Sequence, residues 1–222
     1  MAYTHLLFDH DGVLVNTEPL YLQAIQEQLA TLGIELLESD YVKGMATGAD
    51  PWALARAAGK DEAAIAQLRG ARDTRYQQLL RSQPIRIPQA DEVIAVLAEH
   101  FQLAIVTTSR DEDFDLIHGL DGAAKTSDTP DVVRHMDFVL KRSSYINSKP
   151  DPEPYLLALS RFGIEPAKAL VIEDSERGLR AAVAAGIDCA ALYHPFTAAQ
   201  NFDKARYRFE SLQTLQRFLL NQ

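Results

Sequence analysis

Short apolar runs that end at or just before polar residues recur along this chain, and they restrict its fold more than any other feature. The runs lie at residues 5–9, 103–106, 138–140, 169–172 and 189–192. Runs of this length are typical of strands that are covered on both faces of a sheet. Between them, helices are expected at 19–32, 93–97, 152–162 and 176–185. Because strands that alternate with helices imply right-handed crossovers, we predict an α/β fold with a parallel sheet.

One long stretch after the first run breaks this alternation. Residues 34–86 show no strand pattern and are interpreted as short helices, with breaks at Gly44, Gly48, Pro51, Gly59 and Gly70. We therefore predict an all-helical cap subdomain over 16–86, inserted into a core formed by 1–15 and 87–222. The segment 119–136 has weak periodicity and is predicted to be a long surface loop.

Composition and charge limit the classes of partner. The 222 residues carry a formal net charge of −9, which disfavours nucleic acid and anionic membrane surfaces but not a small anionic substrate. No apolar run approaches the ~18 residues of a membrane span, and the first residues do not resemble a signal peptide. The single cysteine, Cys189, is expected in the core. We expect a soluble cytoplasmic protein; its oligomeric state is not indicated.

Polar residues that suit metal and phosphate chemistry follow several of the predicted strands. The acidic residues among them are Asp9, Asp11, Glu173 and Asp174, and the others are Thr107, Thr108, Ser109 and Lys149. In open parallel sheets, ligand sites lie at the carboxyl ends of the strands. Crowded carboxylates repel one another, and a hard cation such as Mg²⁺ relieves that repulsion. Hydroxyl groups and a lysine suit a phosphoryl group. The residues therefore indicate metal-dependent phosphoryl chemistry.

These residues also occur in the order of a known family. Asp9-His10-Asp11-Gly12-Val13-Leu14 resembles the Asp-x-Asp-Gly-x-Leu signature of the haloacid dehalogenase-like superfamily. Thr107 resembles the second motif of that superfamily, and Lys149-Pro150 resembles the third. Glu173-Asp174-Ser175 with Gly178 resembles the fourth. Asn16-Thr17-Glu18 is similar to a segment of its phosphatases and β-phosphoglucomutases that have a helical cap. The resemblance implies a Rossmann-like three-layer core with an inserted cap.

The resemblance also implies a role for each motif. Asp9 would attack phosphorus and form an aspartyl-phosphate, and Asp11 would act as general acid and then as general base. Thr107, Thr108 and Lys149 would bind the phosphoryl group. Mg²⁺ would be held by Asp9, Asp11 through its carbonyl, Glu173 and Asp174. The expected partner is a small phosphorylated metabolite.

Three reactions or roles are weighed. Dehalogenases of this superfamily lack an acid at the position of Asp11, so a phosphate monoester is favoured over a halide. Mutases usually carry a His where this chain has Tyr21, and an Arg near Gly44, where this chain has none. We therefore predict a phosphatase, with a β-phosphoglucomutase-like mutase as the first alternative. A non-catalytic binding or scaffold protein that retains the fold is the second.

Residues of the predicted cap are the candidates for substrate recognition. They are Glu18, Tyr21, Gly44, Arg72 and Arg75. His10, between the two acids of the first motif, is expected to pack against the cap.

Overall fold

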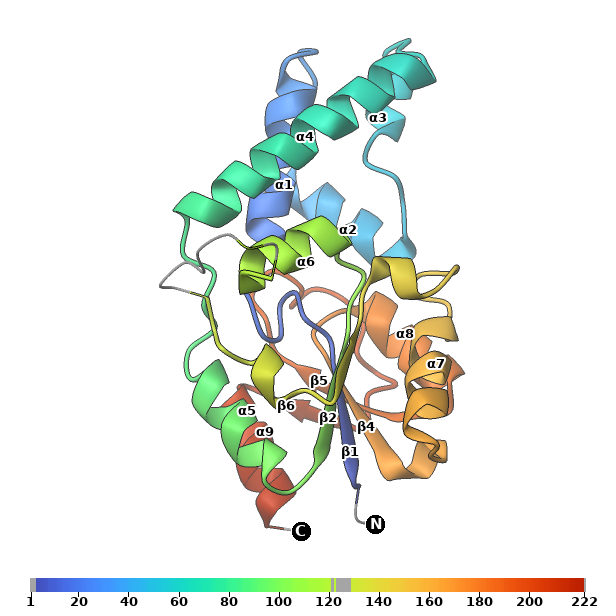
Figure 1. Ribbon diagram of the computed structural model, residues 1–222. Coiled ribbons are helices and arrows are strands. Elements are labelled where there is room, and N and C mark those ends of the chain that lie inside the picture. The colour runs from blue at the N-terminus through green and yellow to red at the C-terminus, as the bar shows by residue number, and fades with distance from the viewer. Residues whose placement is uncertain (1–2, 121, 123–128, 222) are drawn as a thin grey trace.

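The computed structural model describes residues 3–120, 122 and 129–221, in which six parallel strands form one sheet of order β3-β2-β1-β4-β5-β6 (Figure 1). The strands are β1 His5–Phe8, β2 Gln102–Val106, β3 Phe138–Leu140, β4 Ala169–Glu173, β5 Asp188–Leu192 and β6 Tyr207–Phe209. β1 pairs with β2 on one side and with β4 on the other, all in parallel. The chain thus turns back past β1 after β3, and the crevice at such a reversal is where α/β sheets bind ligands.

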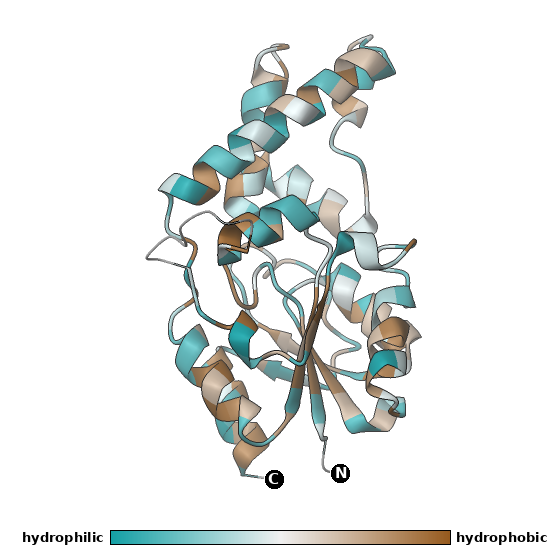
Figure 2. Ribbon diagram, viewed as in Figure 1, coloured by the Kyte–Doolittle hydropathy of each residue, from teal (hydrophilic) through white to brown (hydrophobic). Residues whose placement is uncertain are grey.

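Helices cover both faces of the sheet. α5 (Ala90–Ala98) and α9 (Leu212–Leu220) pack on one face, and α7 (Glu153–Phe162) and α8 (Glu176–Ala184) on the other. Neighbouring residues of β1 enter different cores: Leu6 packs with the first pair and Leu7 with the second. Figure 2 shows the resulting hydrophobic strands between helices whose outer sides are hydrophilic. Double coverage is the reason that the strands are apolar without alternation, and the predicted α/β, Rossmann-like architecture is confirmed.

Four helices between β1 and α5 lie beyond the carboxyl ends of the strands (Figure 1). They are α1 Glu18–Ala30, α2 Glu38–Thr47, α3 Ala53–Ala57 and α4 Glu62–Ser82. One apolar cluster buries Ile25 of α1, Ile65 of α4 and Trp52, which lies directly before α3. These helices thus share an apolar core, to which Phe196 from the segment after β5 also contributes. The division into a cap over 16–86 and a core stays a prediction.

The predicted helix breaks at Gly44 and Gly70 are wrong, because both glycines lie inside helices. A Cβ built on Gly70 meets no atom within 4 Å, so this position faces open space. Glycine inside a helix costs only about 1 kcal/mol relative to alanine, and the packing of α4 exceeds that. Gly48, by contrast, ends α2 with a φ of 74°.

Two segments join these four helices to the sheet, and they are hydrogen-bonded to each other. The N–H of Asn16 donates to the carbonyl of Ile85 at 2.7 Å. Val15 forms an antiparallel bridge with Arg86. The outgoing and returning chains therefore run side by side.

Some elements were not predicted. They are α6 (Asp111–His118), β6 and α9, together with 3-10 turns at Val133–His135, Arg142–Ser144 and Pro166–Lys168. Of the loop predicted over 119–136, residues 121 and 123–128 lie outside the described residues, and the first of these turns lies within its remainder. Cys189 is buried, as predicted. Within the described part of the chain, no helix has both the length and the hydropathy of a membrane span.

Candidate active site

A buried lysine joins two carboxylates at the carboxyl end of the sheet. The Nζ atom of Lys149 lies 2.8 Å from Asp9 Oδ1 and 2.6 Å from Glu173 Oε1, and it also donates to the carbonyl of Val106 at 2.8 Å. All three ammonium hydrogens thus have an acceptor. Burial lowers the pKa of Lys149, but the charges of Asp9 and Glu173 outweigh burial and raise it overall. The lysine is therefore a fixed cation beside Asp9.

Three carboxylates meet beside this lysine. Asp9, Glu173 and Asp174 are buried, and one oxygen of each lies within 4.8 Å of the others. Burial, and then the charge of Glu173, raise the pKa of Asp9 to about 6 and that of Asp174 well above its usual range. Three hard oxygen donors with mutual repulsion fit a divalent cation such as Mg²⁺.

The turn after β1 is shaped to admit this cluster. Gly12 has a φ of 81°, and a Cβ built on it lies 2.1 Å from Asp174 Oδ2. The conformation favours glycine, and the carboxylate of Asp174 occupies the space that a side chain at residue 12 would need. Glycine in the first motif is thus required twice, by the backbone and by Asp174.

Asp11 is turned away from the three-carboxylate cluster. The hydroxyls of Thr17 and Ser109 donate to its carboxylate, and that of Thr107 donates to Oδ2 at 3.3 Å. Burial raises the pKa of Asp11, but His10 and the hydroxyls of Ser109 and Thr17 outweigh burial and lower the pKa overall. The side chain of Asp11 is thus ionised and held in one orientation. The predicted contribution of Asp11 to the metal site rests on its carbonyl and stays a prediction.

His10 does not contact the helices α1 to α4, and the expectation that it packs there is wrong. Its Nε2 lies 2.9 Å from His118 Nε2, and its ring packs against Phe114, both on α6. Its Nδ1 lies 3.5 Å from Asp11 Oδ2. His10 therefore supports Asp11 from the sheet side.

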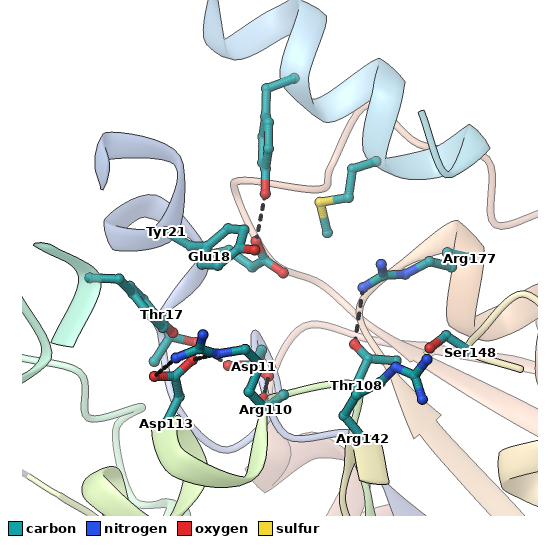
Figure 3. Close-up of a pocket in the computed structure, with 14 residues that line it drawn as sticks. Asp11, Thr17, Glu18, Tyr21, Thr108, Arg110, Asp113, Arg142, Ser148 and Arg177 are labelled. Carbon is teal, nitrogen blue, oxygen red and sulfur yellow. Dashed lines mark hydrogen bonds and ion pairs between the residues drawn. The ribbon is translucent and has the colours of Figure 1, made fainter. Parts of the chain in front are cut away.

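A cavity of about 320 Å³ opens above Asp11 (Figure 3). Its walls come from the sheet side, among them Thr108, Ser109 and Arg177, and from the helices α1, α2 and α4. A second cavity of about 500 Å³ between the helices shares Tyr21, Tyr41, Met45 and Arg177 with the first. A ligand above Asp11 would therefore contact both parts of the chain.

Two of the five residues predicted to recognise substrate lie in the first cavity. Glu18 and Tyr21, both on α1, line it (Figure 3). Tyr41 donates to Glu18 Oε2 at 3.3 Å. Burial, and then the charge of Asp11, raise the pKa of Glu18 to about 7, although Arg177 opposes this rise. Glu18 is therefore a side chain that can exchange a proton near neutral pH.

The other three residues do not line the cavity above Asp11. Gly44 and Arg72 line only the second cavity. Arg72 is buried, donates to the hydroxyl of Tyr21, and lies 4.7 Å from the centre of its ring. Arg75 lines neither cavity, because its guanidinium is paired with Glu27 at 2.6 Å. The structure thus brings Arg72, but not Arg75, to the cavity system.

Comparison with known proteins identifies the family. The family model described as haloacid dehalogenase-like hydrolase matches residues 6–192. This chain is a haloacid dehalogenase-like hydrolase. Protein CbbY of Rhodobacter capsulatus is 31% identical over 96% of this chain and 95% of that protein. The family predicted from the four motifs is therefore confirmed.

One further relative of this haloacid dehalogenase-like hydrolase is named for its substrates, and one solved structure contains phosphate. The phosphorylated carbohydrates phosphatase of Thermotoga maritima is 29% identical over 82% of each chain. The crystal structure of CbbY from Rhodobacter sphaeroides in complex with phosphate has a TM-score of 0.75 and 25% identity, and covers 96% of each chain. These names agree with the enzyme class predicted from the sequence, a phosphoric monoester hydrolase.

Sequence reasoning missed several residues that line the active-site cavity of this haloacid dehalogenase-like hydrolase. They include Arg110, Asp113, Arg142, Ser148 and Arg177. Some had a local signal: Arg110 follows the hydroxyl-rich turn after β2, and Arg177 follows the acidic motif after β4. Arg142 had none, because the 3-10 turn that carries it has no periodicity.

Proposed function

We propose that this hydrolase is a phosphatase that removes phosphate from a small phosphomonoester, a sugar phosphate or a similar metabolite. The observation that carries the proposal is the position of Asp9, a buried carboxylate 2.8 Å from Lys149 and two residues from Asp11. The phosphatases among its relatives support it, and so does the size of the cavity above Asp11. A cytoplasmic location belongs to the same proposal.

Asp9 would act as the nucleophile. One of its oxygens attacks phosphorus, the bond from phosphorus to the ester oxygen breaks, and an aspartyl-phosphate forms. Lys149, already bound to Asp9, would offset the negative charge that accumulates on the phosphoryl oxygens. The hydroxyl of Thr107 and the turn that follows it would position the same oxygens.

Asp11 would move the protons. Its carboxylate is ionised in the free protein, and the negative charge of a bound phosphate raises its pKa, so it gains a proton when substrate binds. It would give that proton to the leaving oxygen as the alcohol departs. It would then take a proton from water, whose oxygen attacks phosphorus and releases inorganic phosphate from Asp9.

The carboxylates of Asp9, Glu173 and Asp174 would hold Mg²⁺. The cation, when bound, supplies positive charge between an anionic nucleophile and an anionic substrate. The fit rests on three buried oxygen donors whose repulsion the cation would relieve.

The test is release of inorganic phosphate from a panel of sugar phosphates and other phosphomonoesters, with Mg²⁺ or with EDTA. The Asp9→Asn variant is expected to lose activity by several orders of magnitude, and EDTA is expected to abolish release by the wild type. No release from any ester would contradict the proposal. A mutase would then be tested with a sugar phosphate and its bisphosphate, and failure there would favour a non-catalytic protein.

A further inference from the structure

The ammonium of Lys149 has two carboxylate partners, and only one of them is the proposed nucleophile. Its Nζ atom lies 2.6 Å from Glu173 Oε1 and 2.8 Å from Asp9 Oδ1. The side chains of Lys149 and Glu173 are 2% and 0% exposed. Attraction between charges is strong where water is excluded, so a Glu173 carboxylate that was free to move would draw Lys149 away from Asp9. The position of Lys149 beside Asp9 therefore depends on what holds Glu173 in place.

Tyr155 contacts both members of the pair formed by Lys149 and Glu173. Its hydroxyl donates to Glu173 Oε1 at 2.8 Å, the same oxygen that accepts from Lys149. The centre of its ring lies 4.9 Å from the Nζ atom of Lys149. Tyr155 is near the start of α7 and is fully buried. A single side chain thus contacts the cation through its ring and the anion through its hydroxyl.

The hydroxyl of Tyr155 limits how strongly Glu173 holds the lysine. Oε1 of Glu173 receives two donors, and a hydrogen bond to a carboxylate offsets part of its negative charge. The other oxygen, Oε2, accepts from the hydroxyl of Ser175 at 2.9 Å. Because both oxygens are hydrogen-bonded, the carboxylate is held in one orientation. The lysine therefore keeps part of its charge for Asp9 and for a phosphoryl group beside it.

The ring of Tyr155 fixes one side of the ammonium. The face of an aromatic ring attracts a cation within about 6 Å of its centre, and the ring also fills the space on that side of Lys149. Tyr155 belongs to the apolar core that the sheet forms with α7 and α8, so the ring is held by its neighbours. Val106, whose carbonyl accepts a further hydrogen of Lys149, is in the same core. The ammonium is thus held by a packed wall as well as by its hydrogen bonds.

We propose that Tyr155 is a positioning residue for the phosphatase reaction, which holds Lys149 beside Asp9 by fixing Glu173 through its hydroxyl and the ammonium through its ring. This inference rests on the proposed function and adds a residue to it. Tyr155 lines neither cavity, so it acts through Lys149 and not on the substrate. Its effect should appear in kcat, because a displaced lysine no longer offsets the charge that develops when Asp9 attacks phosphorus.

Phosphate release by variants of Tyr155 tests the inference. Tyr155→Phe keeps the ring and removes the hydroxyl. It is expected to lower kcat by about 10-fold, the lower end for a hydrogen bond to a charged group, and to leave KM unchanged. Tyr155→Leu removes the ring as well and should lower kcat further. A tyrosine with a structural role alone would change the stability of the protein but not the kcat of its folded form.

Tyr3→Phe is the matched control. The hydroxyl of Tyr3 also donates to a carboxylate, that of Asp188 at 2.7 Å, and Tyr3 is also buried. Asp188 begins β5, whereas Glu173 ends β4, so the two carboxylates are at opposite ends of the parallel sheet. Tyr3→Phe should therefore leave kcat unchanged. Thermal unfolding of each variant establishes that it is folded.

A second measurement needs neither turnover nor metal. In proton–nitrogen NMR spectra of protein treated with EDTA, the side-chain ammonium signal of Lys149 reports its surroundings, and Lys149→Met assigns it. In the wild type this signal should exchange slowly with water and should be shifted by the ring of Tyr155, because the ammonium is buried and faces that ring. Tyr155→Phe should move the signal and speed its exchange with water, whereas Tyr3→Phe should leave it unchanged.

Either an unchanged kcat or an unchanged ammonium signal in Tyr155→Phe would overturn the inference. An equal fall in kcat in Tyr155→Phe and Tyr3→Phe would do so too, since the loss of any buried hydroxyl would then have the same effect. Absence of phosphate release by the wild type would instead contradict the proposed function. In that case the ammonium signal would still decide whether Tyr155 holds Lys149 in place.

Discussion

The carboxylate of Glu173 occupies the space that a side chain at Gly178 would need: a Cβ built on Gly178 lies 1.8 Å from Glu173 Oε1. Glu173 has no room to yield, because Lys149, Tyr155 and Ser175 all donate to it. The glycine in the first turns of α8 is therefore a requirement of the active site.

The Gly178→Ala substitution should destabilise the protein by about 1–3 kcal/mol, because it overpacks a rigid buried site. Gly70→Ala is the matched control, since that glycine is also inside a helix but has open space at its Cβ. It should stabilise the protein by about 0.5–1 kcal/mol through helix propensity. Urea unfolding measures both. Equal effects would show that Glu173 does move aside.

Added Mg²⁺ should stabilise the folded protein, by about 2.7 kcal/mol at a concentration 100 times its Kd. The Asp174→Asn variant should lose this response and, without metal, should be at least as stable as wild type, since one of three repelling carboxylates is gone. Asp203→Asn, at an exposed carboxylate, is the control. Thermal unfolding with Mg²⁺ or EDTA makes the measurement, and an unchanged response in Asp174→Asn would contradict the assigned ligands.

Stability should fall with rising pH through Glu18. Burial raises its folded-state pKa to about 7 from 4.5. The contribution of Glu18 to the free energy of unfolding is therefore fully present below about pH 4.5 and is lost as the pH rises through about 7. The reason is that Glu18 loses its proton at a lower pH in the unfolded chain than in the folded protein. The resulting change in the free energy of unfolding is about 3 kcal/mol at most, because a shift of one pKa unit corresponds to about 1.36 kcal/mol.

The Glu18→Gln variant removes this titration. Urea unfolding between about pH 4.5 and pH 8 should therefore show a smaller decline in this variant than in wild type. Glu99→Gln, at an exposed position, serves as the control. Parallel profiles for wild type and Glu18→Gln would mean that Glu18 is not desolvated.

Arg72 and Arg75 should respond differently to alanine, although both are on α4. Arg72 is buried against Tyr21, so Arg72→Ala should cost about 1–3 kcal/mol and lower kcat/KM. Arg75 is in a half-exposed pair with Glu27, so Arg75→Ala should cost less than about 1 kcal/mol and leave kcat/KM unchanged. Urea unfolding and phosphate release measure the two quantities, and a larger kinetic effect of Arg75→Ala would reverse their assignment.

The convergence of Asp9 and Glu173 was predictable, because residues at the carboxyl ends of parallel strands meet at one edge of the sheet. Lys149 lies between β3 and α7 and ends no strand, and its role was implied by the resemblance of Lys149-Pro150 to the third motif of the superfamily. Which of Arg72 and Arg75 reaches the cavities could not be predicted from the sequence. They are one helical turn apart, and only the crossing of α4 over α1 places one beside Tyr21 and the other beside Glu27.

The elements that escaped prediction are short or depend on distant contacts. The first turn of α6 is Asp-Glu-Asp, and its helical state depends on the burial of Phe114 and Ile117. β6 has three residues at the edge of the sheet. Gly70 was predicted to break a helix but lies inside α4. The packing of α4 outweighs the low helix propensity of one glycine.

The hydrogen-bonded pair of segments at Asn16 and Ile85 joins the helices α1 to α4 to the sheet at one place. Because the two segments are tied to each other, a rotation of α1 to α4 would bend both at the same place and about one axis. Asp9, Lys149 and Glu173 all lie on the sheet side of that axis. A rotation of the helices that released a product would therefore not change the distances between Asp9, Lys149 and Glu173 before the next turnover.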